Sequence, residues 1–568
     1  MEPFNKPYHS LLLLCSFVVV AFGQPAWVWW MGLLASAAGF ACLWRVLLAL
    51  PRPSHRFWLA FGWYSAVQVV QLSWMVSHPF AYIYAVLLLL ACLFGAQFGF
   101  LALWIIPENI RSWGRLGGLA ALWTLLEWSR LFLFSGYSLN PVGLALSSSL
   151  YSMQLASIGG VFLLSFWVML TNLSVLRCWM EGVHSKAVSV TIGLILFPYL
   201  FGWLHFHYHE KRLMQQDTSL SVLLVQPALP IEENMHFQSA EEARAFVLHE
   251  WKIILATMVP YLHRQVDLIV MPEYLVPYGT FHAIYPLQEV KALLLELYGP
   301  QVEAAFPHVE SPWAEWVDTS QGPRWWVTNA YLAQTVANLF KADLVAGLED
   351  SEYEEGHNAS YSSAFHFKPG QVVPMRYEKQ VLLPMGEYIP FDWCKKLAAR
   401  YGISGSFTAG AEAKIFEGTV PMGASICYEE TFGNLMRNIR LKGGELLVNL
   451  TNDGWYPHSR LVYQHFDHAR LRTVESGIPL VRACNTGLTA ACDSLGRVLA
   501  YIEPEKPNAL HVNVPRYHYK TIYTFLGDSL VVGLCVLVLG RAFLGPFHRS
   551  SKERRDQRDH RDGKDSSN

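Results

Sequence analysis

The chain has 568 residues, of which 52% are hydrophobic and 15% are charged. Its mean hydropathy of +0.22 is too high for one ordinary soluble globule, so part of the chain is expected in a membrane. The net charge of −2 gives no electrostatic basis for binding nucleic acid. Nine cysteines occur without any CxxC pair, which argues against a disulfide framework and against a cysteine-based zinc site.

Long apolar runs dominate the first 206 residues, and one more lies near the C-terminus. A spanning helix needs about 20 mostly apolar residues, because the hydrocarbon core of a bilayer is about 30 Å thick. Eight stretches meet this requirement, although the first could instead be a signal sequence without a clear cleavage site. The predicted spans are 9–23, 26–50, 57–77, 81–106, 116–135, 151–176, 187–206 and 522–544.

Basic residues occur in alternate predicted loops, and the loops between them contain no Lys or Arg. Cytoplasmic loops carry an excess of Lys and Arg, so this alternation predicts that both chain termini are cytoplasmic. A soluble domain between the seventh and eighth spans would then lie outside. The tail mixes Arg with Asp and is predicted to be disordered. The basic loop residues are Lys6, Arg52, Arg56, Arg111, Arg115, Arg177 and Lys186.

Two polar features of the apolar region have a functional and a structural interpretation. Glu127 and Arg130 lie three residues apart on one side of the fifth predicted span. Charges in a membrane are functional suspects, but we favour a neutralising pair that fixes helix packing. His205, His207 and His209 would share one face of a strand and could there bind a metal. Their position at the end of a span favours an interfacial aromatic belt instead.

Between residues 218 and 515, short apolar runs alternate with helical or loop segments. Buried strands that alternate with helices predict a layered α/β domain, in which chemistry gathers at the strand ends. The chain is therefore divided into a seven-helix membrane domain (1–206), this soluble domain (218–515), an eighth membrane helix (522–544) and a cytoplasmic tail (548–568). The predicted strands are 220–226, 267–273, 342–349, 423–429 and 444–453, and the predicted helices are 240–259 and 460–476.

A tryptophan-rich segment from about 284 to 339 interrupts this pattern. Exposed aromatic side chains in a domain held against a bilayer could dip into lipid. An insertion with a small core of its own explains the composition equally well. Both alternatives stay open from the sequence.

Three segments of the soluble domain carry residue types that suit acyl transfer. Glu273 ends the run IVMPE, Lys379 lies in MRYEKQVLLPMGEYIP, and Cys427 lies between a predicted strand and a predicted helix. A helix N-terminus and a nearby cation lower the pKa of a thiol. Glu273 could take the thiol proton, while the backbone N–H of Tyr428 and the ammonium of Lys379 could stabilise an oxyanion.

Each of these residues alone has an ordinary structural explanation, as a buried cysteine or a solvated ion pair. Together the three segments resemble the nitrilase, or carbon–nitrogen hydrolase, superfamily, whose triad is Glu–Lys–Cys in that chain order. The resemblance extends to NDGWYPHS and QHFDHARLRTVESGIPLVRACNTG and covers nearly the whole soluble domain. It implies an αββα sandwich with Glu273 as the base, Lys379 as the oxyanion stabiliser and Cys427 as the nucleophile.

A nitrilase-like domain between a seventh and an eighth helix resembles the apolipoprotein N-acyltransferase family of bacterial inner membranes. PMGEYIP and CYEETF are similar to that family's motifs. By this resemblance Glu387 assists in the site, and Tyr428 and Glu429 follow the nucleophile. The resemblance implies acyl transfer from a phospholipid to a diacylated apolipoprotein through a cysteine thioester. It implies no metal and no cofactor, and it leaves the oligomeric state open.

Two other functions compete with this interpretation. A membrane-tethered amidase of the same superfamily would need the triad but no access to lipid. A transporter or scaffold with an inactive soluble domain is disfavoured by the complete Glu–Lys–Cys set and by the few charges within the predicted spans. The membrane context favours acyl transfer over hydrolysis of a small amide.

Overall fold

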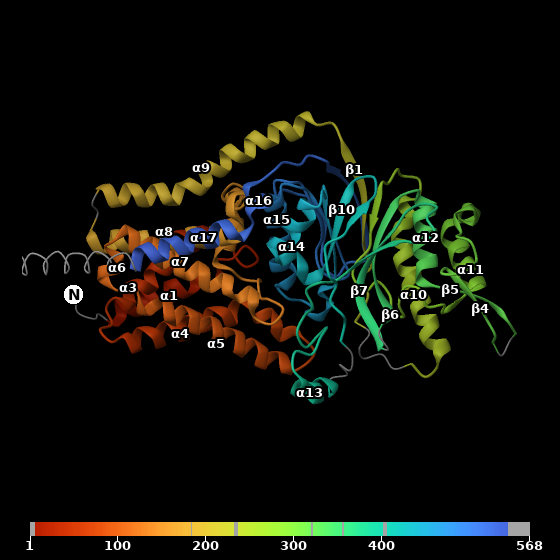
Figure 1. Ribbon diagram of the computed structural model, residues 1–568, viewed down its shortest axis with the longest axis horizontal. Helices are drawn as coiled ribbons and strands as arrows, with labels where there is room; N and C mark the ends of the chain where they lie inside the picture. The colour runs from red at the N-terminus through yellow and green to blue at the C-terminus, as the bar shows by residue number, and fades with distance from the viewer. Residues whose placement is uncertain are drawn as a thin grey trace, which may run out of the picture.

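The computed structural model of the protein describes residues 6–182, 185–231, 237–319, 322–354, 357–400 and 406–543. Figure 1 shows a bundle of helices at one end of the molecule and a layered α/β domain at the other. We call residues 6–215 together with 522–543 the helical domain, and residues 219–515 the α/β domain. The charged tail predicted from 548 onward lies outside the described residues.

Every stretch that was predicted to span the membrane contains a helix. The second stretch is not one regular helix, because a π-helical turn, η1 (Ala35–Gly39), separates two α-helical parts. The helices of this domain are α1 (Lys6–Phe22), α2 (Met31–Leu34), α3 (Phe40–Leu47), α4 (Pro53–Gln71), α5 (Tyr82–Leu103), α6 (Pro107–Ile110), α7 (Trp113–Ser129), α8 (Ala156–Glu181), α9 (Ser185–Gln215), α16 (Ile522–Leu526) and α17 (Asp528–Phe543).

Among the residues that the structure describes, three helices are long and apolar enough to cross a membrane. They are Tyr82–Leu103, Ser152–Glu181 and Lys186–Gln215. The first two pack within the bundle, whereas α9 lies along its edge and is mostly exposed. Eight spans therefore remain a prediction, since the other described helices are shorter or less apolar.

The three histidines near the end of the seventh predicted span lie on helix α9, so the strand that the metal alternative required does not form. Residues four apart share one face of a helix, and the rings of His205 and His209 lie 4.5 Å apart between centroids. His205 is hydrogen-bonded to Gln154 at 3.1 Å, and His209 to the Tyr517 hydroxyl at 2.7 Å. These two histidines therefore join α9 to neighbouring segments.

The α/β domain contains two six-stranded sheets, in the orders β15-β1-β2-β6-β7-β8 and β14-β13-β12-β11-β10-β9. All five predicted strands are present in these sheets. Their strands are β1 (Ser219–Gln226), β2 (Leu268–Val270), β6 (Asp343–Glu354), β7 (His357–Phe367), β8 (Met375–Glu378), β9 (Ile415–Glu417), β10 (Pro421–Ile426), β11 (Leu446–Thr451), β12 (Leu480–Cys484), β13 (Thr489–Cys492), β14 (Val498–Ile502) and β15 (Asn508–Pro515).

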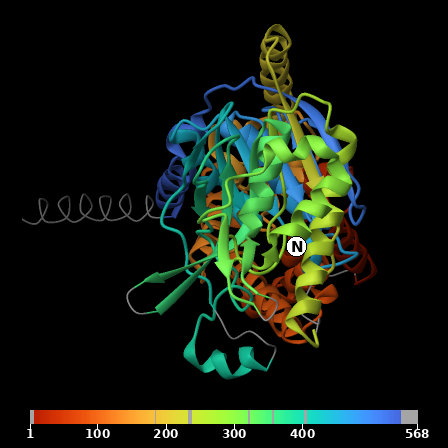
Figure 2. The same cartoon turned by 90° about the vertical axis from the view of Figure 1, so that its right-hand side faces the viewer.

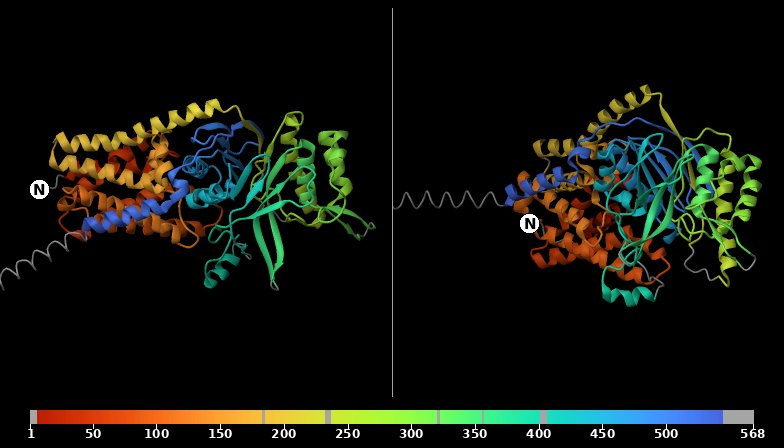
Figure 3. Two further views of the ribbon diagram at one scale, coloured as in Figure 1. Left: turned by 45° about the horizontal axis from the view of Figure 1, so that its top comes forward. Right: turned by 45° about the vertical axis from the view of Figure 1, so that its right-hand side comes forward.

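The two sheets pack face to face, with a core of apolar side chains from both sheets between them. Helices α10 (Ala240–Met258) and α12 (Asn329–Phe340) cover the outer face of the first sheet. Helices α14 (Gly433–Leu441) and α15 (Leu461–Ser476) cover the outer face of the second. This αββα order confirms the predicted sandwich, and Figures 2 and 3 show its layers from other sides.

The tryptophan-rich segment packs into the apolar core on the outer face of the first sheet and has no separate core of its own among the described residues. It forms a small sheet of β3 (Tyr285–Pro286), β5 (Arg324–Val327) and β4 (Ala314–Val317), followed directly by α12. Helix α11 (Leu287–Tyr298) covers this part, and Trp313 is buried there. Figure 1 places these elements at the end of the molecule farthest from the helical domain, which argues against contact with lipid. The segment is an insertion, but its core is shared with the α/β domain.

The two domains contact each other at a kink in α8. Gly159 and Gly160 leave the helical conformation, and Gly160 has a φ of +64°. The freed backbone N–H of Val161 donates to the carboxylate of Glu475 from α15 at 2.9 Å. A side chain at Gly160 would collide with the ring of Tyr523. The kink therefore needs glycine both for its left-handed backbone and for the close approach of Tyr523 from α16 and Glu475 from α15.

We predict that Gly160→Ala destabilises the protein by about 1–3 kcal/mol, because it adds backbone strain and a steric clash at this joint. The apparent unfolding midpoint in detergent should fall accordingly. Gly193→Ala in α9 is the matched control, since nothing lies within 4 Å of its added carbon. Alanine favours a helix by about 1 kcal/mol over glycine, so this control should not lower the midpoint. Equal midpoints for both variants would refute the role of the kink.

Candidate active site

The ends of strands from both sheets place the three residues that were predicted to form a triad. Glu273 follows β2, while Lys379 directly follows β8. Both strands belong to the first sheet. Cys427 directly follows β10 of the second sheet. The structure thus brings together side chains that lie far apart in the sequence.

The ammonium of Lys379 is completely buried between two carboxylates. Its Nζ lies 3.0 Å from Glu273 Oε1 and 2.6 Å from Glu387 Oε1. Burial alone would lower the pKa of Lys379, but the two carboxylates outweigh it and hold that pKa well above its usual range. Burial raises the pKa of Glu273, although Lys379 opposes this. The lysine therefore stays charged, and the three groups carry one net negative charge when both carboxylates are ionised.

Cys427 begins a short 3₁₀ turn, η10 (Cys427–Thr431), rather than the predicted α-helix. Its φ of +52° lies in the left-handed region, and its thiol interacts electrostatically with the Glu273 carboxylate. Burial and the Glu273 charge hold the pKa of Cys427 well above its usual range, against the effect of Lys379. The predicted lowering of this pKa is therefore wrong. A protonated thiol beside a carboxylate needs that carboxylate as its base.

Glu429 fastens the segment around Lys379 to η10, which we call the nucleophile turn because it begins with the candidate nucleophile Cys427. Burial raises the pKa of Glu429 to about 6, while the N–H groups around the carboxylate oppose the rise. The group is therefore mostly ionised at neutral pH and accepts four hydrogen bonds. The donors are the backbone N–H groups of Ile426 (2.8 Å), Gln380 (2.6 Å) and Val381 (3.1 Å), and the hydroxyl of Tyr377 (2.9 Å).

Tyr428 extends from the same turn into the helical domain. Its hydroxyl donates to the carbonyl of Gly136 and accepts from the backbone N–H of Ser138, both at 3.2 Å. Tyr428 belongs to the apolar core of the helical domain, and Cys427 packs against that core. The nucleophile turn therefore lies at the boundary between the two domains.

Sequence reasoning missed a buried network beneath this turn. Arg482 donates to Glu430 at 2.9 Å and to Asp453 at 3.1 Å. His465 lies 3.0 Å from Asp453, between the same two carboxylates. Burial raises the pKa of Asp453, but Arg482 and His465 outweigh it and the pKa is lowered. These residues lie within motifs that carry the family resemblance, but their mutual contacts depend on the fold.

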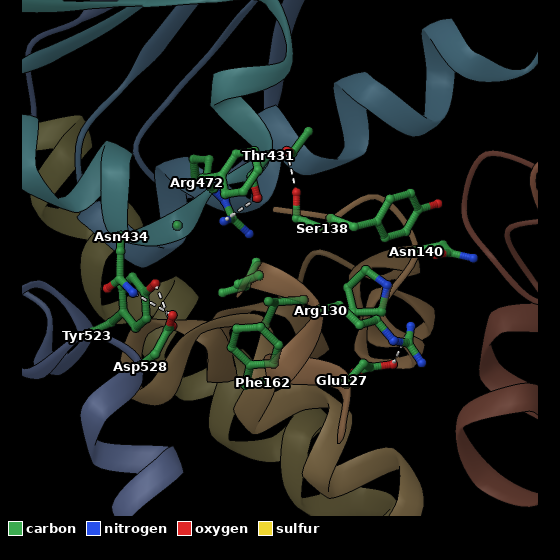
Figure 4. Close-up of a pocket in the computed structure, with 16 residues that line it drawn as sticks. Glu127, Arg130, Ser138, Asn140, Phe162, Thr431, Asn434, Arg472, Tyr523 and Asp528 are labelled. Carbon is green, nitrogen blue, oxygen red and sulfur yellow. Dashed lines mark hydrogen bonds and ion pairs between the residues drawn. The ribbon is translucent and has the colours of Figure 1, made fainter. Parts of the chain in front are cut away.

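A cavity of about 490 Å³, partly open to solvent, lies between the domains and is shown in Figure 4. It is lined by Glu127 and Arg130, which lie 3.9 Å apart. Arg472, on the opposite wall, pairs with Glu475 at 3.2 Å. Each guanidinium thus has its own carboxylate, and no triad residue lines the cavity. Glu127 also accepts from the backbone N–H of Val142 at 2.9 Å, in agreement with the structural role we favoured for this pair.

Across the described part of the chain, no group of three or more His, Cys, Asp or Glu side chains is arranged to hold a metal ion.

The paired sheets, with Glu, Lys and Cys at strand ends, define a protein of the carbon–nitrogen hydrolase class. The family model described as carbon-nitrogen hydrolase matches residues 236–538, and the model described as apolipoprotein N-acyltransferase N-terminal domain matches residues 11–174. The chain is similar to proteins named apolipoprotein N-acyltransferase. The one from Chlamydia caviae is 34% identical, covering 94% of this chain and 97% of its own length. That from Chlamydia pneumoniae is 31% identical, covering 95% and 98%. This chain belongs to the apolipoprotein N-acyltransferase family.

We predict that Glu429→Gln loosens the segment that carries Lys379. The substitution places an NH₂ group among donors, and a buried unsatisfied donor costs about 1–3 kcal/mol. Amide hydrogen exchange of residues 378–383 should accelerate. Glu412→Gln makes the same chemical change at a side chain that is 66% exposed and should leave this exchange unchanged. Equal exchange in the two variants would show that Glu429 does not fasten the segment.

We also predict that Glu273→Gln lowers the pH midpoint for alkylation of Cys427 by iodoacetamide. The Glu273 charge raises the pKa of this thiol, so its removal increases the thiolate fraction at any given pH. Modified Cys427 can be quantified by peptide mass spectrometry over a pH series. Glu296→Gln, at an exposed position on α11, is the control. An unchanged or higher midpoint would mean that Glu273 does not act on the thiol.

Proposed function

We propose that this protein transfers a fatty acyl chain from a phospholipid to the N-terminal amine of a diacylglyceryl-cysteine apolipoprotein. The observation that carries the proposal is the position of Cys427, which packs against the apolar core of the helical domain and interacts electrostatically with the Glu273 carboxylate. A nucleophile at this boundary is reachable by a lipid acyl chain. The relatives' shared name supports the same reaction.

In the first step, Glu273 takes the proton of the Cys427 thiol while sulfur attacks the carbonyl carbon of the phospholipid ester. The carbonyl electron pair moves to oxygen, and the Lys379 ammonium and the Tyr428 N–H stabilise this oxyanion. The oxyanion then collapses and expels the lysophospholipid alkoxide, which takes the proton from Glu273. A thioester on Cys427 remains.

In the second step, the α-amine of the apolipoprotein attacks the thioester carbonyl and forms a second oxyanion in the same place. Glu273 takes a proton from the amine and returns it to the Cys427 sulfur as the carbon–sulfur bond breaks. The products are an N-acylated lipoprotein and the free thiol. Glu387 assists by holding Lys379, while Tyr428 and Glu429 hold the turn against the helical domain and the Lys379 segment.

Exposed aromatic side chains beside the site support a lipid substrate. Phe132 and Phe134 of the helical domain are 66% and 50% exposed. Phe391 and Trp393, on the segment that follows Glu387, are 46% and 74% exposed. Phe134 and Phe391 lie 5.8 Å apart between ring centroids. Large exposed aromatic groups of this kind favour the interface of a membrane.

The arrangement of the loops supports an outward-facing α/β domain in a bacterial inner membrane, with both termini cytoplasmic. The predicted loops without Lys or Arg contact this domain, through Gly136 and Ser138 at Tyr428 and through His78 at Tyr456. The ends of α3 and α6 lie at the opposite end of the bundle (Figure 1), where the basic loops occur. This is the distribution that the positive-inside rule requires.

The alternative, a membrane-tethered amidase, would use the same triad on a small amide. It requires no phospholipid and no acyl-thioester derived from one. Detection of that intermediate separates the two functions.

We predict that the purified protein, mixed with phospholipid alone, forms an acyl-thioester on Cys427 that neutral hydroxylamine cleaves. Cys427→Ala should give neither this intermediate nor any increase in the acyl count of an apolipoprotein N-terminus, because the substitution removes the sulfur on which the thioester forms. Mass spectrometry of the intact protein and of the lipoprotein peptide measures both.

Cys92→Ala removes an exposed thiol of the helical domain and should behave as the unchanged protein. Normal N-acylation by Cys427→Ala would refute the proposal. Turnover of small amides without any phospholipid-derived thioester would favour the amidase.

A further inference from the structure

The backbone carbonyl of Cys427 is held by two buried side chains. Asn449 Nδ2, from β11, lies 3.3 Å from this oxygen, and His465 Nε2, from α15, lies 3.2 Å from it. Asn449 is 0% exposed and His465 is 3% exposed. Because a carbonyl oxygen can only accept, both nitrogens donate to it.

The direction of this carbonyl also sets the direction of the next N–H group. The peptide bond between Cys427 and Tyr428 is trans, so its C=O and N–H point to opposite sides. Two donors on the buried side of the carbonyl therefore turn the Tyr428 N–H toward the other side. The left-handed conformation of Cys427 costs about 1–2 kcal/mol, so the turn needs such contacts to persist.

The surroundings of His465 fix the position of its ring and place a hydrogen on Nε2. Its Nε2 lies 3.2 Å from Glu430 Oε1 as well as from the Cys427 carbonyl, and two acceptors require a hydrogen on this nitrogen. Its Nδ1 lies 3.0 Å from Asp453, and Arg482 binds both Asp453 and Glu430. This network holds the imidazole as a donor to the nucleophile turn.

We propose that Asn449 and His465 are positioning residues that aim the Tyr428 N–H at the oxyanion. The assignment deepens the proposed function and rests on its Cys427 nucleophile. Neither side chain touches the reacting atoms, because both act through the Cys427–Tyr428 peptide. The orientation of the Tyr428 N–H matters only in steps in which an electron pair of the substrate's carbonyl group moves to its oxygen.

Acylation and alkylation of the Cys427 sulfur therefore depend differently on the direction of the Tyr428 N–H. Attack on an ester carbonyl forms an oxyanion, which then expels the alcohol and leaves an acyl-thioester. Attack on iodoacetamide forms a sulfur–carbon bond and releases iodide and a proton without any oxyanion. A misdirected Tyr428 N–H therefore slows acylation alone, whereas a displaced Cys427 slows both reactions.

The test uses the full-length protein in detergent. Acylation of Cys427 is measured as the burst of p-nitrophenolate from p-nitrophenyl butyrate, and alkylation is measured with iodoacetamide at the same pH. His465→Leu removes the donor and should slow the burst by about tenfold or more, approaching the about 10²–10³ lost with an oxyanion donor itself. Its alkylation rate should stay within about twofold of the unchanged protein.

His465→Gln places an amide N–H near the position of Nε2 and should restore most of the burst rate. Asn449→Leu should likewise slow acylation and leave the alkylation rate unchanged. This variant provides the test if His465→Leu does not fold. His249→Leu makes the same change at an exposed position on α10 and should change neither rate.

The inference is overturned if His465→Leu acylates normally, if alkylation falls in parallel with acylation, or if His465→Gln is as slow as His465→Leu. These outcomes do not depend on the physiological donor, because the ester probe reports the oxyanion step directly. Failure of phospholipid to form a thioester on the unchanged protein would refute the proposed function instead.

Discussion

The burial of the Lys379 ammonium is the constraint on which the candidate site depends. An isolated buried charge costs several kcal/mol, so the ion is stable only where carboxylates surround it. Glu273 and Glu387 meet this need, with carboxylate oxygens 3.0 and 2.6 Å from the Lys379 Nζ. The two carboxylates come from separate segments, which follow β2 and β8 of the first sheet. Burial and the Glu273 charge raise the pKa of Cys427. Under the proposed function, the thiol therefore stays protonated until Glu273 accepts its proton. One electrostatic requirement thus fixes the geometry of the base, the cation and the thiol.

The nucleophile turn also has to be held from both sides, because its left-handed backbone does not persist alone. On one side Tyr428 lies in the core of the helical domain. On the other side Glu429 fastens the turn to the segment after β8, and His465 holds the Cys427 carbonyl. Glu475 extends this support to the kink of α8. The helical domain is therefore part of the site's framework as well as its anchor.

The sequence predicted the features that are local or periodic. Apolar runs identified the helical segments, short apolar runs identified the strands, and strand-end motifs identified Glu273 and Cys427 as neighbours. It did not predict the direction of the Cys427 pKa, because burial and a carboxylate 154 positions away outweigh the nearby cation. Asn449 and His465 were missed for a similar reason. Their partner is a backbone carbonyl, and because every residue has one, no residue type in the sequence marks this contact.

Water is the competing acceptor for any thioester, so the surroundings of Cys427 decide whether acyl transfer is productive. Cys427 packs against the helical domain's core together with Tyr456, which stacks edge-on against Trp74 at 4.8 Å between ring centroids. Under the proposed function, an acyl chain that enters from the helical side completes this apolar wall and excludes water from the thioester. The amine acceptor then reaches the carbonyl while it is anchored in the same bilayer. Attachment of both substrates to the membrane thus favours aminolysis over hydrolysis.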